Sequence, residues 1–134
     1  MRAADDWCDV KDMLGKVLIL FHECKTTEKY IDLDPSLRSQ AMFPMLRADD
    51  AERDCASFLL INNPKKCDSS YINEQNFIIR TRADEFTSVS EDKRKNAFAC
   101  GAQIISTDYP VRKGITAEDY VVSFENYKTI SLVK

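Results

Sequence analysis

The stretch GAQIISTDYP, residues 101–110, has the pattern of a strand that ends in polar groups. It begins with a small, permissive glycine, continues through an apolar run, and stops on Asp108, Tyr109 and a proline. Similar runs occur earlier in the chain, and all four are of strand length: residues 15–21 (GKVLILF), 57–62 (SFLLIN), 76–82 (NFIIRTR) and 102–107 (AQIIST). Each is apolar at consecutive positions, which is typical of a parallel strand that is covered on both faces.

The segments between these runs carry helix signals. In SEDKRKNAFACG, residues 90–101, Ser90 can cap a helix that Gly101 ends. DPSLRSQAMF, residues 34–43, has Asp34 as a candidate cap and a proline at the first helical position, so it also predicts a helix. A shorter helix is expected at 72–76 (INEQN). Strand, crossover and strand in succession predict an α/β fold with a parallel sheet.

The tail has a different pattern. DYVVSF, residues 119–124, and KTISLVK, residues 128–134, are separated by three residues and favour a hairpin of two strands.

The bulk composition indicates one soluble domain and excludes some partners. The chain has 134 residues, 31% of them charged, a net charge of −3 and a pI of about 5.2. This balance argues against a general nucleic-acid binder, which would carry a basic face. No apolar stretch is long enough to span a bilayer, and the first ten residues lack the apolar region of a signal peptide. The cellular location stays open.

The five cysteines have no CxxC spacing, so a zinc site is not expected. Two interpretations remain: buried thiols, or one or two disulfides with Cys55 and Cys67 as the favoured pair, because they flank a strand-like run.

Polar residues gather just past the C-terminal ends of the four runs, where ligands bind in parallel α/β proteins. Arg80 and Arg82 would share one strand face and need an anionic partner, either a ligand phosphate or nearby aspartates. Asp108 can orient an arginine, bind a ligand hydroxyl or cap a turn. The other candidates also have two interpretations, as ligand contacts or as packed or solvated residues: His22, Glu23, Asp84 and Tyr109.

Five motifs occur in an order that resembles a known family: GKVLILF, DPSLRSQAMF, FLLINNP, IIRTRAD and RKNAFACGAQIISTDYP. Over residues 14–110 they are similar to the C-terminal half of the calcium-dependent phosphoinositide phospholipase C family. TDYP alone is less specific, because glycerophosphodiester phosphodiesterases of the same superfamily end their barrels similarly. The resemblance implies about four βα units of a PLC-like phosphodiesterase TIM barrel at 14–134, after a leading segment at 1–13.

The resemblance also implies a chemistry. In that family the inositol 2-hydroxyl attacks phosphorus, two histidines act as base and acid, and Ca²⁺ stabilises the developing charge. The histidines and calcium ligands belong to the first half of the barrel, and a full barrel needs about 250 residues. This chain has one histidine, His22, at a strand end where relatives tend to carry an aspartate and animal enzymes a phosphate-binding lysine. No catalytic residue and no calcium ligand is therefore assigned here.

What carries over is substrate binding. Arg80 and Arg82 are expected to contact phosphate or inositol, and Asp84, Asp108 and Tyr109 to contact inositol hydroxyls and pack against the ring, with His22 as a further candidate. The chain is thus expected to be a fragment of a phosphoric diester hydrolase that acts on a phosphoinositide or related diester. The alternatives are a non-catalytic half-barrel that binds anionic head groups or self-associates, and a relative of the glycerophosphodiester phosphodiesterases.

Overall fold

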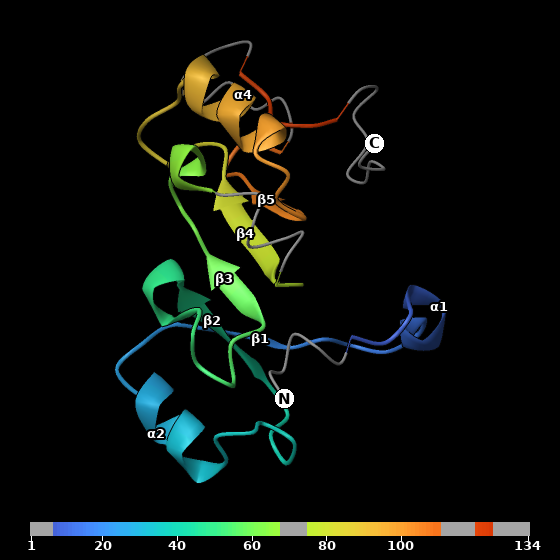
Figure 1. Ribbon diagram of the computed structural model, residues 1–134. Coiled ribbons are helices and arrows are strands. Elements are labelled where there is room, and N and C mark those ends of the chain that lie inside the picture. The colour runs from blue at the N-terminus through green and yellow to red at the C-terminus, as the bar shows by residue number, and fades with distance from the viewer. Residues whose placement is uncertain (1–6, 68–74, 111–119, 125–134) are drawn as a thin grey trace.

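The computed structural model describes residues 7–67, 75–110 and 120–124. Its centre is one five-stranded sheet in the order β1-β2-β3-β4-β5, and every neighbouring pair is parallel. The strands are β1 (Leu20–His22), β2 (Phe43–Arg47), β3 (Phe58–Leu60), β4 (Ile78–Arg82) and β5 (Ile104–Ser106). The sheet curves as part of a barrel wall (Figure 1), which confirms the α/β fold and the partial TIM barrel.

Helical segments follow most strands and cover one side of the sheet. They are α2 (Thr27–Leu33), the 3₁₀ turns η2 (Ala48–Asp50) and η3 (Pro64–Lys66), and α4 (Glu91–Ala99). A short helix, α1 (Val10–Met13), precedes β1 and lies away from them, on the other side of the sheet in this view (Figure 1). The succession of parallel strands and covering helices is the βαβ arrangement that the sequence predicts.

The two faces of the sheet have different roles. On the helix-covered face, Leu46, Leu59 and Ile79 are buried and form the centre of the main core. The opposite face corresponds to the inside of a barrel, and it is partly exposed at Leu60 and Arg80 but buried at Met45 and Phe58. The core thus lies outside the curve of the strands, and the inner face is left with polar and apolar groups in contact with solvent.

The helix predicted at residues 90–101 is confirmed. Ser90 lies at its N-cap, and its hydroxyl accepts a hydrogen bond from the backbone N–H of Lys93 at 3.3 Å. After the helix, Gly101 has a φ of 78°, in the left-handed region that glycine adopts without steric cost. Ala97 is fully buried against the second core cluster, which fixes the helix on the sheet next to β4.

The helix predicted at residues 34–43 is wrong. The Asp34 carboxylate accepts four hydrogen bonds, from the backbone N–H and the hydroxyl of both Ser36 and Ser39, at 2.6–3.0 Å. This network stabilises a compact turn, in which Leu37 has a φ of 57°, in place of a helical first turn. β2 begins directly after it, at Phe43, and is a strand that the sequence pattern did not reveal.

The predicted tail hairpin is not formed in its described part. Residues 120–124 contain no strand and pack across the end of the sheet as an irregular segment. The Val122 N–H donates to the Tyr109 carbonyl at 2.9 Å, and the Tyr120 hydroxyl donates to the Ala83 carbonyl at 3.3 Å. Residues 128–134 and most of the short helix expected at 72–76 lie outside the described residues.

The disulfide interpretation of the cysteines is not realised. Cys55, the favoured partner, is a free and buried thiol. The Cys67 thiol lies 3.6 Å from the Cys100 carbonyl oxygen, on the same side of the core. Burial raises the pKa of the Cys55 thiol above its ordinary value, which keeps it protonated and unreactive.

Candidate functional site

The candidate site is the set of polar side chains at the C-terminal ends of β1 to β5, called the rim below. On β4, burial alternates along the strand from Ile78 to Arg82. Arg80 and Arg82 therefore point to the inner face, and Ile79 and Thr81 point to the core. The prediction that the two arginines share a face is confirmed.

Arg80 has no ion-pair partner among the described residues. Its guanidinium donates one hydrogen bond, from Nη1 to the Oδ1 of Asn62 at 2.9 Å, and an amide carries no charge. Partial burial, and then the neighbouring charge of Arg82, lower the pKa of Arg80 below its ordinary value. The Asp108 carboxylate acts in the opposite direction, but its ion pair is with Arg82. An anionic ligand would give the Arg80 guanidinium an ion-pair partner of its own.

Arg82 is paired within the rim. Its Nη2 lies 3.1 Å from the Oδ2 of Asp108, and both side chains are about one-third exposed. This contact joins the ends of β4 and β5. The pair offers both an acceptor and a donor to a ligand, and it cancels most of the Arg82 charge.

Asp84 lies behind the rim and has no exposed surface. Its carboxylate accepts a hydrogen bond from the Thr107 hydroxyl through Oδ2 and another from the Asp108 N–H, at 2.8 Å, through Oδ1. The Thr107 hydroxyl oxygen accepts in turn from the Tyr109 N–H at 2.9 Å. In this arrangement Asp84 positions Asp108, and its oxygens are turned away from any ligand at the inner face.

Tyr109 is also largely buried, at 8% exposure. Its hydroxyl donates to the Phe86 carbonyl at 2.6 Å, and its ring packs edge-on against Tyr120, with centroids 5.4 Å apart. Tyr109 therefore ties the β4–α4 loop to the end of β5. Of the six predicted residues, Arg80, Arg82, Asp108 and His22 present surface to solvent, while Asp84 and Tyr109 support the rim from behind.

His22 is exposed at the end of β1, at a distance from the other candidates. Strand register puts it in one row with Met45, Phe58 and Ile78, three strand spacings or about 14 Å along the sheet from β4. Its Nδ1 lies 3.4 Å from the Glu23 carbonyl oxygen, a contact with its own chain neighbour. The structure does not bring His22 together with Arg80 and Arg82.

Arg47 is a rim residue that sequence analysis missed. It ends β2, and its Nε donates to the Oε2 of Glu23 at 2.6 Å. Register places Arg47 in one row with Leu60 and Arg80, on the same inner face. The signal that could have found it was the run FPMLR, in which the arginine is the last residue of the strand, as Arg82 is the last residue of β4.

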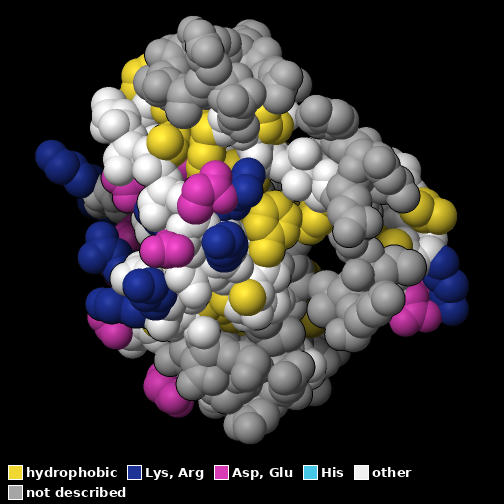
Figure 2. Space-filling model, turned by 90° about the horizontal axis from the view of Figure 1, so that it is seen from above, with side chains coloured by type: hydrophobic (Ala, Val, Ile, Leu, Met, Phe, Trp, Pro, Cys, Tyr) yellow, Lys and Arg dark blue, Asp and Glu magenta, His cyan; other side chains and the backbone are white. Residues whose placement is uncertain are grey.

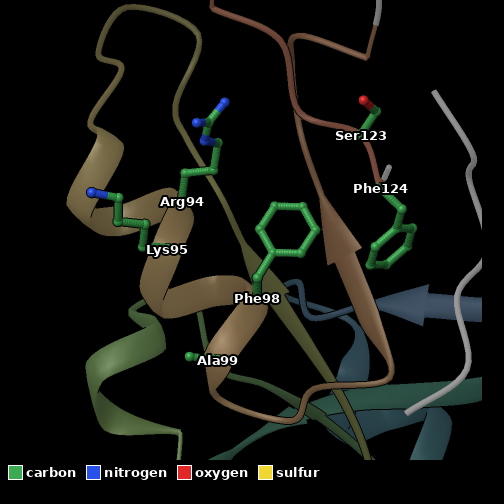
Figure 3. A pocket seen from close by; sticks show the side chains of 6 residues that line it. All are labelled: Arg94, Lys95, Phe98, Ala99, Ser123 and Phe124. Atoms are coloured by element: carbon green, nitrogen blue, oxygen red, sulfur yellow. The ribbon is translucent and has the colours of Figure 1, made fainter. Parts of the chain in front are cut away.

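Two hollows lie beside α4. One, of about 500 Å³, adjoins Arg80 through Asn62 and lies between η3 and the start of α4. Its Lys93 pairs with Glu85 at 2.9 Å. The other, of about 600 Å³, separates α4 from residues 123–124, where the rings of Phe98 and Phe124 meet edge-on at 5.3 Å (Figure 3).

Charges of both signs are interleaved on one face of the molecule. Figure 2 shows Lys and Arg side chains alternating with Asp and Glu along one side of the molecule as seen from above. In the ion pairs of the rim, each arginine other than Arg80 has a carboxylate beside it.

A metal site is not formed by the described residues alone. Within them, no group of three or more His, Cys, Asp or Glu side chains lies close enough together to hold an ion. These residues therefore do not fit a calcium ion by themselves. In the same ranges, no helix has the length and apolar character needed to cross a membrane.

A protein-family model matches most of the chain. The sequence model of phosphoinositide phospholipase C, Ca2+-dependent, matches residues 3–132. The chain belongs to this family. Searches among curated proteins and among solved structures found no match.

Membership of the phosphoinositide phospholipase C family agrees with the fold and with the place of the rim. The five parallel strands form part of a phosphodiesterase barrel, and the motifs IIRTRAD and GAQIISTDYP form the ends of β4 and β5. The resemblance drawn from the sequence is confirmed. The description of the family also calls it Ca²⁺-dependent.

Proposed function

We propose that this chain supplies the substrate-binding side of the barrel mouth in a phosphoric diester hydrolase that acts on a phosphoinositide or a related diester. The observation that carries the proposal is Arg80. This guanidinium faces the inside of the barrel wall and, among the described residues, is bonded only to the neutral Asn62. A phosphodiester monoanion is the partner that it lacks.

The neighbouring residues would orient the rest of the head group. The Arg82–Asp108 pair presents one donor and one acceptor next to Arg80, which suits a ring hydroxyl. Asp84 holds the Asp108 backbone, so the acceptor is fixed before the ligand arrives. Tyr109 closes the end of β5 behind them.

Catalysis would need groups beyond these. Proton transfer at the attacking hydroxyl and at the leaving oxygen requires a positioned base and acid. His22 is the single histidine and lies far along the sheet from Arg80. The proposal therefore assigns binding and orientation to this chain, and it assigns general acid–base catalysis to a complementary part of the barrel.

Binding of myo-inositol 1-phosphate, measured by isothermal titration calorimetry, tests the proposal. Arg80→Gln should weaken it by about 10-fold to 100-fold, because a charge-assisted hydrogen bond contributes about 1.5–3 kcal/mol. Arg38→Gln is the matched control, since Arg38 is exposed in the turn before β2, at the opposite end of the sheet. A folded wild-type chain that does not bind, or an Arg80→Gln variant that binds equally well, would contradict the assignment.

A second candidate function is a half-barrel that self-associates. Large apolar side chains are exposed in the segment that precedes β1, at Val10, Leu14, Val17, Leu18 and Ile19. Surface of this kind favours association. Sedimentation equilibrium separates the two candidates: this one expects a stable dimer without added protein, and a monomer at 50–100 micromolar, on the order of ordinary working concentrations, would exclude it.

A further inference from the structure

We propose that Cys67 and Cys100 are joined in a disulfide when the protein meets a small-molecule disulfide as oxidant, and that this bond closes the segment with β4 and α4 into a covalent loop. All five cysteines are free thiols in the structure, which is therefore that of the reduced protein. Both cysteines pack against the main core on the covered side of the sheet, so the proposal does not depend on what the rim binds.

Cys67 and Cys100 hold equivalent places in the fold, because each ends a helical segment. Cys67 is the C-cap of η3, and Cys100 is the C-cap of α4. The segments η3 and α4 lie side by side and pack against each other (Figure 1). The two cysteines therefore meet, although 33 residues separate them in the chain.

The distance between the two side chains is suited to a disulfide. The Cys67 Sγ lies 3.6 Å from the Cys100 carbonyl oxygen, and thus at most about 6 Å from the Cys100 Cα. In natural disulfides the two Cα atoms are about 4.4–6.8 Å apart. The Cys100 Sγ points back along α4, 3.3 Å from the Ala97 carbonyl oxygen. One staggered step about its Cα–Cβ bond moves this sulfur by about 3 Å and breaks only a weak hydrogen bond.

Both thiols are within reach of a small molecule, and this separates them from Cys55. The side chains of Cys67 and Cys100 are partly exposed, whereas Cys55 is only 2% exposed. Burial raises the pKa of the Cys55 thiol, and the thiolate is the form that attacks a disulfide. Cys55 is thus a poor competitor, although it packs in the same core.

The other two cysteines lie on the β1 side of the molecule. Cys8 precedes α1, and Cys24 lies in the turn between β1 and α2, where its backbone N–H donates to the Thr27 hydroxyl at 2.9 Å. β1 is an edge strand, and β2 and β3 separate it from β4. Cys67 and Cys100 are therefore the pair that the fold favours.

The chemistry is two successive thiol–disulfide exchanges, with oxidised glutathione as the oxidant. The thiolate of one cysteine attacks a glutathione sulfur, the S–S bond of the oxidant breaks, and one glutathione leaves as a thiolate. The second cysteine thiolate then attacks the protein sulfur of the mixed disulfide and displaces the other glutathione. The two protons of the protein thiols end on the two glutathione thiols, so the protein loses two electrons and the oxidant gains them.

The bond would constrain a defined part of the chain. The closed loop runs from residue 67 to residue 100, and it contains β4 with its two arginines and the whole of α4. Closing a loop of this length removes conformational freedom from the unfolded chain and so favours the folded one. We expect the oxidised protein to melt about 10–20 °C above the reduced protein.

Redox titration of the full chain in glutathione buffers, followed by blocking with iodoacetamide and tryptic peptide mapping, tests the proposal. The expected product links peptide 67–80 to peptide 96–112, and reduction should separate them. The disulfide and the native fold stabilise each other to the same extent. The equilibrium constant for this link should therefore be about 100-fold larger in native buffer than in concentrated urea.

Cys67→Ser and Cys100→Ser should each abolish the rise in melting temperature on oxidation. Cys24→Ser is the matched control, because it removes an exposed thiol outside the pair, and it should keep both the link and the full rise. Oxidised and reduced forms of the same variant are compared, so any effect of the serine itself on stability cancels. Alanine at the same position replaces a serine that prevents folding.

An equilibrium constant that is no larger in native buffer than in urea would overturn the proposal. So would peptide maps of the native protein in which another cysteine pair, or mixed disulfides with glutathione alone, predominate. A rise in melting temperature that persists in Cys67→Ser or Cys100→Ser would also contradict it, because the bond would then lie elsewhere.

Discussion

At the scale of single residues, burial separates side chains that the sequence presents as equals. Asp84 and Asp108 both follow strands and both are polar, yet one is fully buried and the other about one-third exposed. Strand alternation predicted that Arg80 and Arg82 share a face, because period two is a property of the backbone. The role of Asp84 could not be predicted in this way, because it depends on hydrogen bonds from β5, which is far away in the sequence.

Asp84→Asn should destabilise the fold by about 2 kcal/mol, because two hydrogen bonds to a buried carboxylate are exchanged for weaker or mismatched ones. Urea unfolding followed by circular dichroism gives the difference. Asp49→Asn, an exposed aspartate in η2, is the control and should stay within about 0.5 kcal/mol of the wild type. Equal stability of the two variants would show that Asp84 does not hold the rim.

The Asp34 turn should make stability depend on pH in the acid range. Hydrogen bonds from the side chain of Ser36, and then from Ser39, hold the pKa of Asp34 well below its ordinary value. A depressed pKa contributes stability above the unfolded pKa of about 3.9, and this contribution is lost as the pH falls below it. The difference in unfolding free energy between wild type and Asp34→Asn should therefore be full at pH 7 and shrink below about pH 4. A constant difference across this range would refute the assignment.

At the scale of elements, apolar runs predicted four of the five strands, and a cap with a terminal glycine predicted α4. β2 escaped because FPMLR contains a proline and follows a segment that begins like a helix. Asp34 and Pro35 are compatible with both a helix cap and a turn, and the serines at 36 and 39 decided for the turn through side-chain hydrogen bonds. Local patterns are thus least reliable where side chains compete for the same backbone groups.

The cap of α4 gives a prediction at this scale. Ser90→Ala removes the acceptor for the Lys93 N–H and should cost about 1 kcal/mol of unfolding free energy. Thermal and urea denaturation measure the loss. Ser88→Ala, in the same loop and exposed, should be neutral by comparison. An equal effect of both substitutions would indicate that the loop as a whole, and not the cap, supports the helix.

At the scale of the whole molecule, the described residues form a curved wall with a covered outer face and an open inner face. Near the start of the sheet, the ring of Trp7 packs against Phe58 at 5.3 Å and against Phe43 at 6.1 Å. A hollow of about 750 Å³, largely apolar, adjoins this aromatic cluster. The sequence predicted a partial barrel, but strand runs alone do not show which face stays open, because that depends on the curvature.

The two edge strands of the sheet also bear on how the barrel could be completed. β1 and β5 each have a strand neighbour on one side only among the described residues. Unpaired strand edges and an apolar inner surface are the features through which a complementary set of strands would complete the barrel. The account therefore predicts that the rim becomes catalytic only when this wall is joined by the part of the barrel that carries the acid–base groups.

Reconstitution tests this central claim most directly. The chain is mixed with a separately expressed N-terminal half of a phosphoinositide phospholipase C, with calcium present, and release of inositol phosphate from phosphatidylinositol vesicles is followed. We expect turnover in the mixture, none from either part alone, and a loss of about 10-fold or more in kcat/KM with Arg80→Gln. A folded complex that shows no turnover, or turnover that is insensitive to Arg80, would contradict it.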